Sequence, residues 1–175
     1  MKKLARPSGF TLMELVVVIS IIAILAAVAL PRLIEAQRDA RVAKAKAIYG
    51  SLRSAASLAR ARCELDLANA PAPGKVSCGD TPPVVEMDGH PVRIVNHYPA
   101  AAADGIDVAA DLNLAADGLS ASNGTDVNSL GISVAARTYT VSGGSTPQCS
   151  VTYLEAGLKG SSIVGAEVRV ATDGC

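Results

Sequence analysis

The stretch that decides the fold is residues 9–31, which read GFTLMELVVVISIIAILAAVALP. The 21 residues 10–30 contain a single ionisable side chain, Glu14. As a helix with a rise of about 1.5 Å per residue, they would make a rod of roughly 31 Å, which matches the thickness of a bilayer's hydrocarbon core. The sequence therefore predicts a membrane-spanning helix with one carboxylate near its beginning.

Glu14 requires a cationic partner, because an unpaired charge deep in lipid costs at least about 2.5–3.5 kcal/mol. Residues 15–30 carry no charge, and the basic side chains before the helix all precede Gly9. If the chain were cut after Gly9, the nearest cation would be the new amino group of Phe10. We therefore expect Glu14 to pair with that amine, on the same subunit or on a neighbouring one.

Residues 1–9 form a short basic leader. In a secretory signal, the small residue of the cleavage site follows the apolar segment, whereas here Gly9 precedes it. A cut between Gly9 and Phe10 would leave the whole apolar helix on the mature protein. In this arrangement the chain resembles the superfamily of type IV pilins and type II secretion pseudopilins, at Lys2, Lys3, Gly9, Phe10, Thr11, Leu12, Glu14, Leu15 and Pro31.

The resemblance implies how this N-terminus is processed and assembled. In the superfamily, a prepilin peptidase cuts after the glycine that corresponds to Gly9 and methylates the new amine of Phe10. The glutamate that corresponds to Glu14 neutralises the amine of a neighbouring subunit during assembly. The alternative is a plain signal anchor in which Glu14 lies near the membrane interface by chance, and the spacing, the leader and the charge favour the prepilin.

Residues 31–62 predict an amphipathic continuation of the helix, because apolar side chains recur at intervals of three and four. Pro31 is expected to bend the helix, since proline removes one backbone hydrogen bond. The segment has a net charge of +6. Clustered basic side chains can bind nucleic acid, but the net charge of −8 on residues 63–175 opposes DNA binding. We expect a solvated basic face, or one that meets the acidic heads of other subunits, and no nucleic-acid partner.

All four cysteines, Cys63, Cys78, Cys149 and Cys175, follow the apolar helix. An even number of cysteines on one side of a membrane predicts two disulfides and a head outside the cytoplasm. Cys63 and Cys78 would close a loop over residues 66–79. A bridge between Cys149 and Cys175 would fasten the last strand, although the sequence alone leaves the connectivity open.

The predicted fold class is α+β, with one long N-terminal helix packed on an antiparallel sheet. Its parts are a leader at 1–9, a transmembrane and assembly helix at 10–30, a helical stem at 31–62 and a disulfide-stapled head at 63–175. Within the head, turn residues and alternation predict strands at 83–87, 92–98, 132–141, 149–155 and 163–171, a short helix at 100–114, and a mobile polar loop at 116–129.

The tail adds a second resemblance, to the pilins of the mannose-sensitive haemagglutinin group. It is carried by residues 149–156 and 168–175, and more loosely by residues 31–32, 37, 39–41 and 98–101. The resemblance implies a major subunit of a type IV pilus used for surface attachment. The middle of the chain matches least, so mannose binding is not carried over.

Few residues suggest catalytic or metal chemistry. His90 and His97 have no ligand cluster near them in the sequence, and the cysteines lack the close spacing of zinc ligands. The polar run Asp104, Asp107, Asp111, Asn113 and Asp117 lacks the glycine and final glutamate of an EF-hand, which favours a solvated acidic surface over a calcium loop. We expect no enzyme activity, no metal and no cofactor.

The sequence therefore predicts a structural subunit that assembles into a helical homo-oligomeric filament for attachment and biofilm formation. Its expected partners are the prepilin peptidase, the inner-membrane assembly platform, the membrane itself and a surface or host receptor. It would reside in the inner membrane before assembly and in an extracellular pilus afterwards. The alternatives are a type II secretion pseudopilin, which forms a periplasmic filament, and a minor pilin for DNA uptake.

Overall fold

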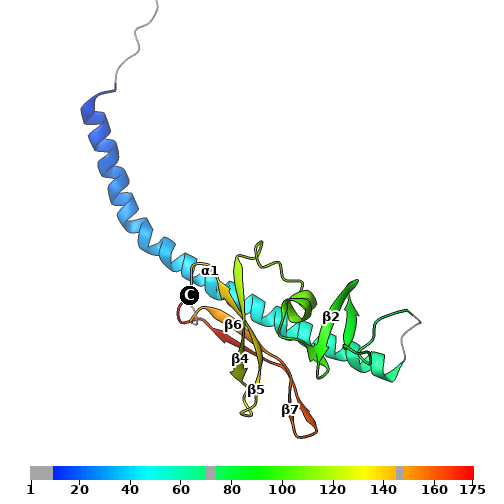
Figure 1. Ribbon diagram of the computed structural model, residues 1–175. Helices are drawn as coiled ribbons and strands as arrows, with labels where there is room; N and C mark the ends of the chain where they lie inside the picture. The colour runs from blue at the N-terminus through cyan, green and yellow to red at the C-terminus, as the bar shows by residue number, and fades with distance from the viewer. Residues whose placement is uncertain (1–9, 70–73, 145–147) are drawn as a thin grey trace, which may run out of the picture. The chain divides into compact units, whose positions relative to one another are not determined.

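A computed structural model describes residues 10–69, 74–144 and 148–175, so that the predicted leader at 1–9 lies outside the described residues (Figure 1). Helix α1 (Leu12–Ala68) comes first, and nine strands and a short π-helical turn follow it in this described part. The chain divides into two compact units, Met1–Asp39 and Ala40–Cys175, and α1 contributes residues to both. The predicted α+β class is confirmed.

The described part of the N-terminal unit is the first half of α1. Every described residue up to position 40 is exposed, and the large apolar side chains between Phe10 and Ile34 are 44–80% accessible. One helix in the described part of the chain is long and apolar enough to cross a membrane, and it is α1. Among the described residues of this unit, nothing covers its apolar side chains.

In the second unit, α1 buries one face against the sheets. The buried positions recur at intervals of three and four, as an amphipathic helix requires: Ala45, Ile48, Leu52, Ala55, Ala56, Ala59, Cys63 and Asp66. The predicted end of the helix near residue 62 is wrong, because α1 continues to Ala68. Cys63 and Asp66 extend the buried face, and Arg62 contacts Asp66 at 3.1 Å across one helical turn.

A three-stranded antiparallel sheet follows, with the order β1 (Val84–Met87), β2 (His90–Val95) and β3 (Tyr98–Pro99). The predicted tight turn between the first two strands is confirmed, since Met87 pairs with His90. Asp88 and Gly89 both have positive φ angles, 49° and 80°. Two residues with positive φ make the turn whose twist suits a two-residue hairpin.

The larger sheet has four antiparallel strands in the order β4 (Leu119–Val127), β5 (Ser133–Val141), β6 (Ser150–Leu154) and β9 (Glu167–Ala171). A separate two-stranded ribbon joins β7 (Gly157–Lys159) to β8 (Ser162–Val164). The inner side chains of β5 and β6 pack on α1 and form the main core, which includes Leu52, Tyr139, Val141, Val151 and Tyr153.

The prediction of a mobile polar loop at 116–129 is wrong, because residues 119–127 form strand β4. All nine residues of β4 pair with β5, from Leu119 opposite Val141 to Val127 opposite Ser133. The strand lies at the edge of the sheet and exposes most of its side chains. An exposed edge strand has little need of apolar residues, so its composition is close to that of a loop.

The single strand predicted at 163–171 is divided into β8 and β9. Gly165 lies in the break, where an added Cβ would approach the Tyr98 hydroxyl oxygen to 2.7 Å. The helix predicted at 100–114 is also shorter, because the π-helical turn η1 (Ala103–Asp107) continues as helix only through residues 108–109 before turns follow. Ile106 is fully buried there, whereas Leu114 is only partly buried.

Two disulfides, Cys63–Cys78 and Cys149–Cys175, join the cysteines in the two pairs that the sequence suggested. The first links the end of α1 to the segment that precedes β1. The second links the start of β6 to residue 175 beyond β9, and Arg41 Nε donates a hydrogen bond to the Cys175 carbonyl at 2.5 Å. All four bridged cysteines are buried, so both disulfides lie in the interior of the head.

Replacement of Gly105 by alanine is expected to destabilise the head. An added Cβ would lie 2.3 Å from the Ala100 carbonyl oxygen and 2.8 Å from its nitrogen, and these backbone atoms cannot move aside as a flexible side chain can. The free energy of unfolding of the full chain in detergent should fall by about 1–3 kcal/mol, measured by urea denaturation.

Gly124→Ala is the matched control, because nothing lies within 4 Å of the Cβ it would gain. Equal stability of the two variants would contradict the assignment of close packing to Gly105.

Candidate functional site

Helix α1 begins in a capping box formed by Thr11 and Glu14. The Glu14 amide donates a hydrogen bond to Thr11 Oγ1 at 3.2 Å, and the Glu14 carboxylate accepts from the Thr11 amide at 3.2 Å. Thr11 Oγ1 itself donates to Glu14 Oε2 at 3.1 Å. A threonine before the helix and a glutamate three residues later satisfy two of the amide groups that a helix start leaves without partners.

Glu14 therefore has polar partners within its own chain, which the sequence analysis did not foresee. In the described residues, both hydrogen bonds to the carboxylate end on Oε2, and none ends on Oε1. Phe10 precedes the box and is 73% exposed. The box fixes the direction of the side chain and leaves one oxygen accessible to a cation.

The remaining residues predicted for this region are placed as follows. Gly9 lies outside the described residues, and Pro31 lies within α1. Proline has no amide hydrogen, so the helix lacks one backbone hydrogen bond at this position. Between Glu14 and Pro31 the apolar side chains stay exposed on all sides of the helix. A segment of this kind is buried only by another molecule or by lipid.

In the head, the strongest polar cluster joins η1 to strand β5. Arg137 donates two hydrogen bonds to Asp107, from Nε to Oδ1 at 2.7 Å and from Nη2 to Oδ2 at 2.5 Å. Tyr139 donates to Asp107 Oδ1 at 2.5 Å, and Arg137 Nη1 donates to Asn123 Oδ1 at 2.6 Å. The side chains of Arg137 and Asp107 are only 8% and 9% exposed.

These contacts and the burial of the cluster raise the pKa values of two of its side chains. The hydrogen bond to Asp107 raises the pKa of the Arg137 guanidinium, and burial raises the pKa of Tyr139. The Asp107 carboxylate is therefore surrounded by donors and belongs to the interior, not to the solvated acidic surface expected from the sequence. The cluster fastens η1 to the sheet.

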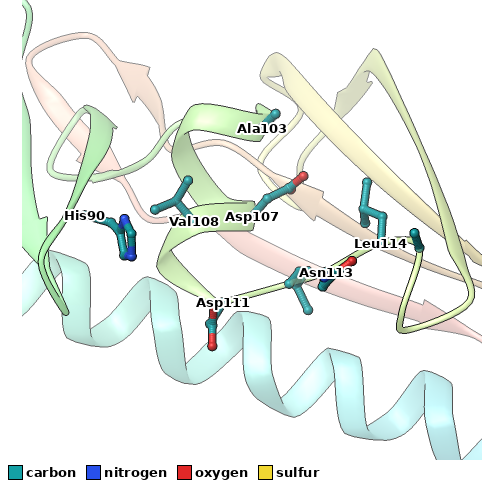
Figure 2. Close-up of a pocket in the computed structure, with 9 residues that line it drawn as sticks. His90, Ala103, Asp107, Val108, Asp111, Asn113 and Leu114 are labelled. Carbon is teal, nitrogen blue, oxygen red and sulfur yellow. The ribbon is translucent and has the colours of Figure 1, made fainter.

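A depression of about 600 Å³ lies beside η1 (Figure 2). His90 and Asp111 lie on its walls, whereas the Asp107 carboxylate turns away from both (Figure 2). His97 lies elsewhere and contacts Glu64 at 3.0 Å. No group of three or more histidine, cysteine or acidic side chains within the described ranges could hold a metal ion. The depression thus offers polar side chains without a set of metal ligands.

Comparison with known proteins identifies one match, at the N-terminus. Residues 4–30 match the family model described as the prokaryotic N-terminal methylation motif. The motif supports a type IV pilin-like or pseudopilin precursor. A long apolar N-terminal helix followed by antiparallel sheets is consistent with the type IV pilin fold. No curated protein and no solved structure gives a significant match.

Tyr139→Phe is expected to change both the stability of the head and its dependence on pH. At neutral pH the variant loses a hydrogen bond to a buried carboxylate, which is worth about 1.5–3 kcal/mol. Because the folded protein raises the pKa of Tyr139, the stability that this tyrosine contributes is complete below about pH 10 and is lost as the pH rises further.

Urea midpoints of the full chain in detergent, measured at neutral pH and near pH 11, check both effects. The variant should be less stable at neutral pH and should lose less stability at the alkaline pH than the unmodified chain. Tyr49→Phe serves as a control, since the Tyr49 hydroxyl makes only a long hydrogen bond of 3.4 Å with Arg53. Unchanged midpoints for Tyr139→Phe would contradict the proposed importance of the cluster.

Proposed function

We propose that this chain is a prepilin whose mature form is the structural subunit of a type IV pilus. The observation that carries the proposal is the N-terminal half of α1, which matches a methylation motif and exposes its apolar side chains along its full length. Before assembly the helix would be stored in the inner membrane. In the filament it would pack against the same helix of other copies, and the heads would form the outer surface.

Processing is proposed to follow the pattern of the motif. A prepilin peptidase would cut the leader, residues 1–9, from Phe10 and methylate the new amine. Residues 10–30 would then form the assembly helix, residues 31–62 the stem and residues 63–175 the head. An inner-membrane platform would lift each subunit from the lipid into the growing fibre.

Glu14 is proposed to set the register of each subunit during assembly. The capping box holds one carboxylate oxygen, and the other would accept the Phe10 amine of a neighbouring copy. A misplaced subunit would leave two charges buried without partners, and each such charge costs several kcal/mol. The correct register is therefore the one in which the carboxylate and the amine meet.

An extracellular pilus is preferred to a periplasmic pseudopilus because of the C-terminal end. The Cys149–Cys175 bridge and the tail around it resemble the mannose-sensitive haemagglutinin group of pilins. The proposed role is attachment to surfaces and biofilm formation, with a surface or host receptor as the partner of the exposed head. DNA uptake is less favoured because the head is acidic.

Replacement of Glu14 by glutamine is expected to abolish surface filaments, or to reduce their number at least tenfold, while the precursor stays in the membrane. The amide keeps the shape of the side chain and still accepts a hydrogen bond from Thr11, but it cannot neutralise an ammonium group. Electron microscopy of whole cells gives the number of filaments, and immunoblotting of membranes gives the amount of subunit.

Glu35→Gln is the matched control, because Glu35 is an exposed carboxylate on the same helix beyond the apolar stretch. Normal filament numbers for Glu14→Gln, with normal incorporation of the variant subunit, would exclude the proposed role of the charge.

A further inference from the structure

In the second unit, α1 has two flanks that contact different parts of the head. On one flank, Ser51 Oγ donates to the Ala110 carbonyl at 3.4 Å, within the segment that follows η1. On the other, Arg53 lines a groove against residues 166–168 at the start of β9. Positions 51 and 53 are about 200° apart around a helix, so the two flanks face opposite ways.

The groove on the β9 flank has a volume of about 340 Å³ and is lined by Tyr49, Arg53, Ser57, Tyr98 and Glu167, among others. Tyr98 is held in place, since Arg60 Nη1 donates to its hydroxyl oxygen at 2.7 Å and the Arg60 guanidinium lies 5.3 Å from the ring centroid. Because the Tyr98 oxygen accepts this bond, its own proton remains available to an acceptor in the groove.

Arg53 is a cation without a carboxylate partner among the described residues. Its guanidinium makes one long hydrogen bond, to the Tyr49 hydroxyl at 3.4 Å. Glu167 lines the same groove but is engaged elsewhere: it accepts from Arg169 at 2.8 Å and from the Ser129 amide at 2.9 Å, and these bonds lower its pKa. The groove therefore presents two donors, Arg53 and the Tyr98 hydroxyl, to an incoming acceptor.

The opposite flank carries an acidic side chain that lacks a basic partner among the described residues. Asp111 follows η1 at an exposed corner with a φ of 49°, and within the described ranges its carboxylate has no hydrogen bond or ion pair. The neighbouring acids are engaged, Asp104 with Arg93 at 2.8 Å and Asp117 with the Asn113 amide at 3.1 Å. Asp111 and Asp107 lie apart on the segment in Figure 2, and only Asp111 is exposed.

We propose that Asp111 of one copy enters the Tyr49–Tyr98 groove of the next copy and pairs with Arg53. The two residues face opposite sides of α1 in one chain, so each can find its partner only in another copy. When identical subunits join through two different surfaces, the contact repeats from copy to copy. If the rotation between neighbouring copies does not close a ring, the copies form an open filament. The proposal rests on the proposed filament function and names the side chains that join neighbouring heads.

Charge exchange tests the pair in the full chain produced in cells. Arg53→Asp and Asp111→Arg, each alone, should reduce surface filaments at least tenfold, because each places like charges at the contact. The double variant restores opposite charges and should return filament numbers to within about threefold of the unmodified chain. Lys159→Asp reverses an exposed charge on β7 that lines neither the groove nor the depression beside η1, and should have no effect.

A covalent test uses Arg53→Lys with a zero-length carbodiimide, which joins a lysine amine to a nearby carboxylate. Intermolecular peptides that link Lys at position 53 to Asp111 should form in sheared filaments, and Asp111→Asn should remove them. If the unmodified chain makes filaments but the link and the charge rescue both fail, the proposed contact is overturned and the filament function stands. If the unmodified chain makes no filaments, the filament function is overturned. If the cross-link is then also absent from membranes, the proposed contact is overturned as well.

Discussion

Helix α1 carries a long apolar segment that no described part of its own chain covers, and this constraint bears on the rest of the molecule. Between Leu12 and Ile34 the large apolar side chains are exposed, and burial of such surface is worth about 25 cal/mol for each Å² removed from water. Lipid or other copies of the same helix must supply the apolar surroundings. The segment is therefore equally suited to storage in a membrane and to the interior of a fibre.

The capping box at the start of α1 gives Glu14 partners within its own chain. An unpaired Glu14 carboxylate would cost free energy in an apolar environment. Within the same chain, however, Thr11 donates two hydrogen bonds to one oxygen of this carboxylate. In the proposed fibre, the remaining oxygen would distinguish a correctly placed neighbour from a misplaced one. Apolar burial would then supply the driving force for assembly, and this incompletely satisfied carboxylate would supply the register.

The head is stabilised by means other than a large apolar core. Four of its eight buried positions on α1 are alanines, and two disulfides together with the Asp107–Arg137–Tyr139 cluster fasten its loops to the sheet. A buried ion pair of this kind stabilises only while both partners are present. The edge strand β4 also belongs to this framework, because its Asn123 accepts a hydrogen bond from Arg137.

The sequence predicted the features that follow from strong local patterns. The apolar run, the spacing of buried positions on α1 and the Asp88–Gly89 turn each leave a clear periodic or turn signal. Strand β4 was missed because an exposed edge strand has the composition of a loop. The Asp107–Arg137 pair spans 30 positions in the sequence, and no local pattern brings those residues together.

The intact mass of the protein recovered from sheared extracellular fibres tests the central claim most directly. A processed pilus subunit would begin at Phe10, carry one added methyl group and lack two pairs of hydrogens because of the disulfides Cys63–Cys78 and Cys149–Cys175. A chain that keeps residues 1–9, or one found only in membranes and never in the fibre fraction, would contradict this claim.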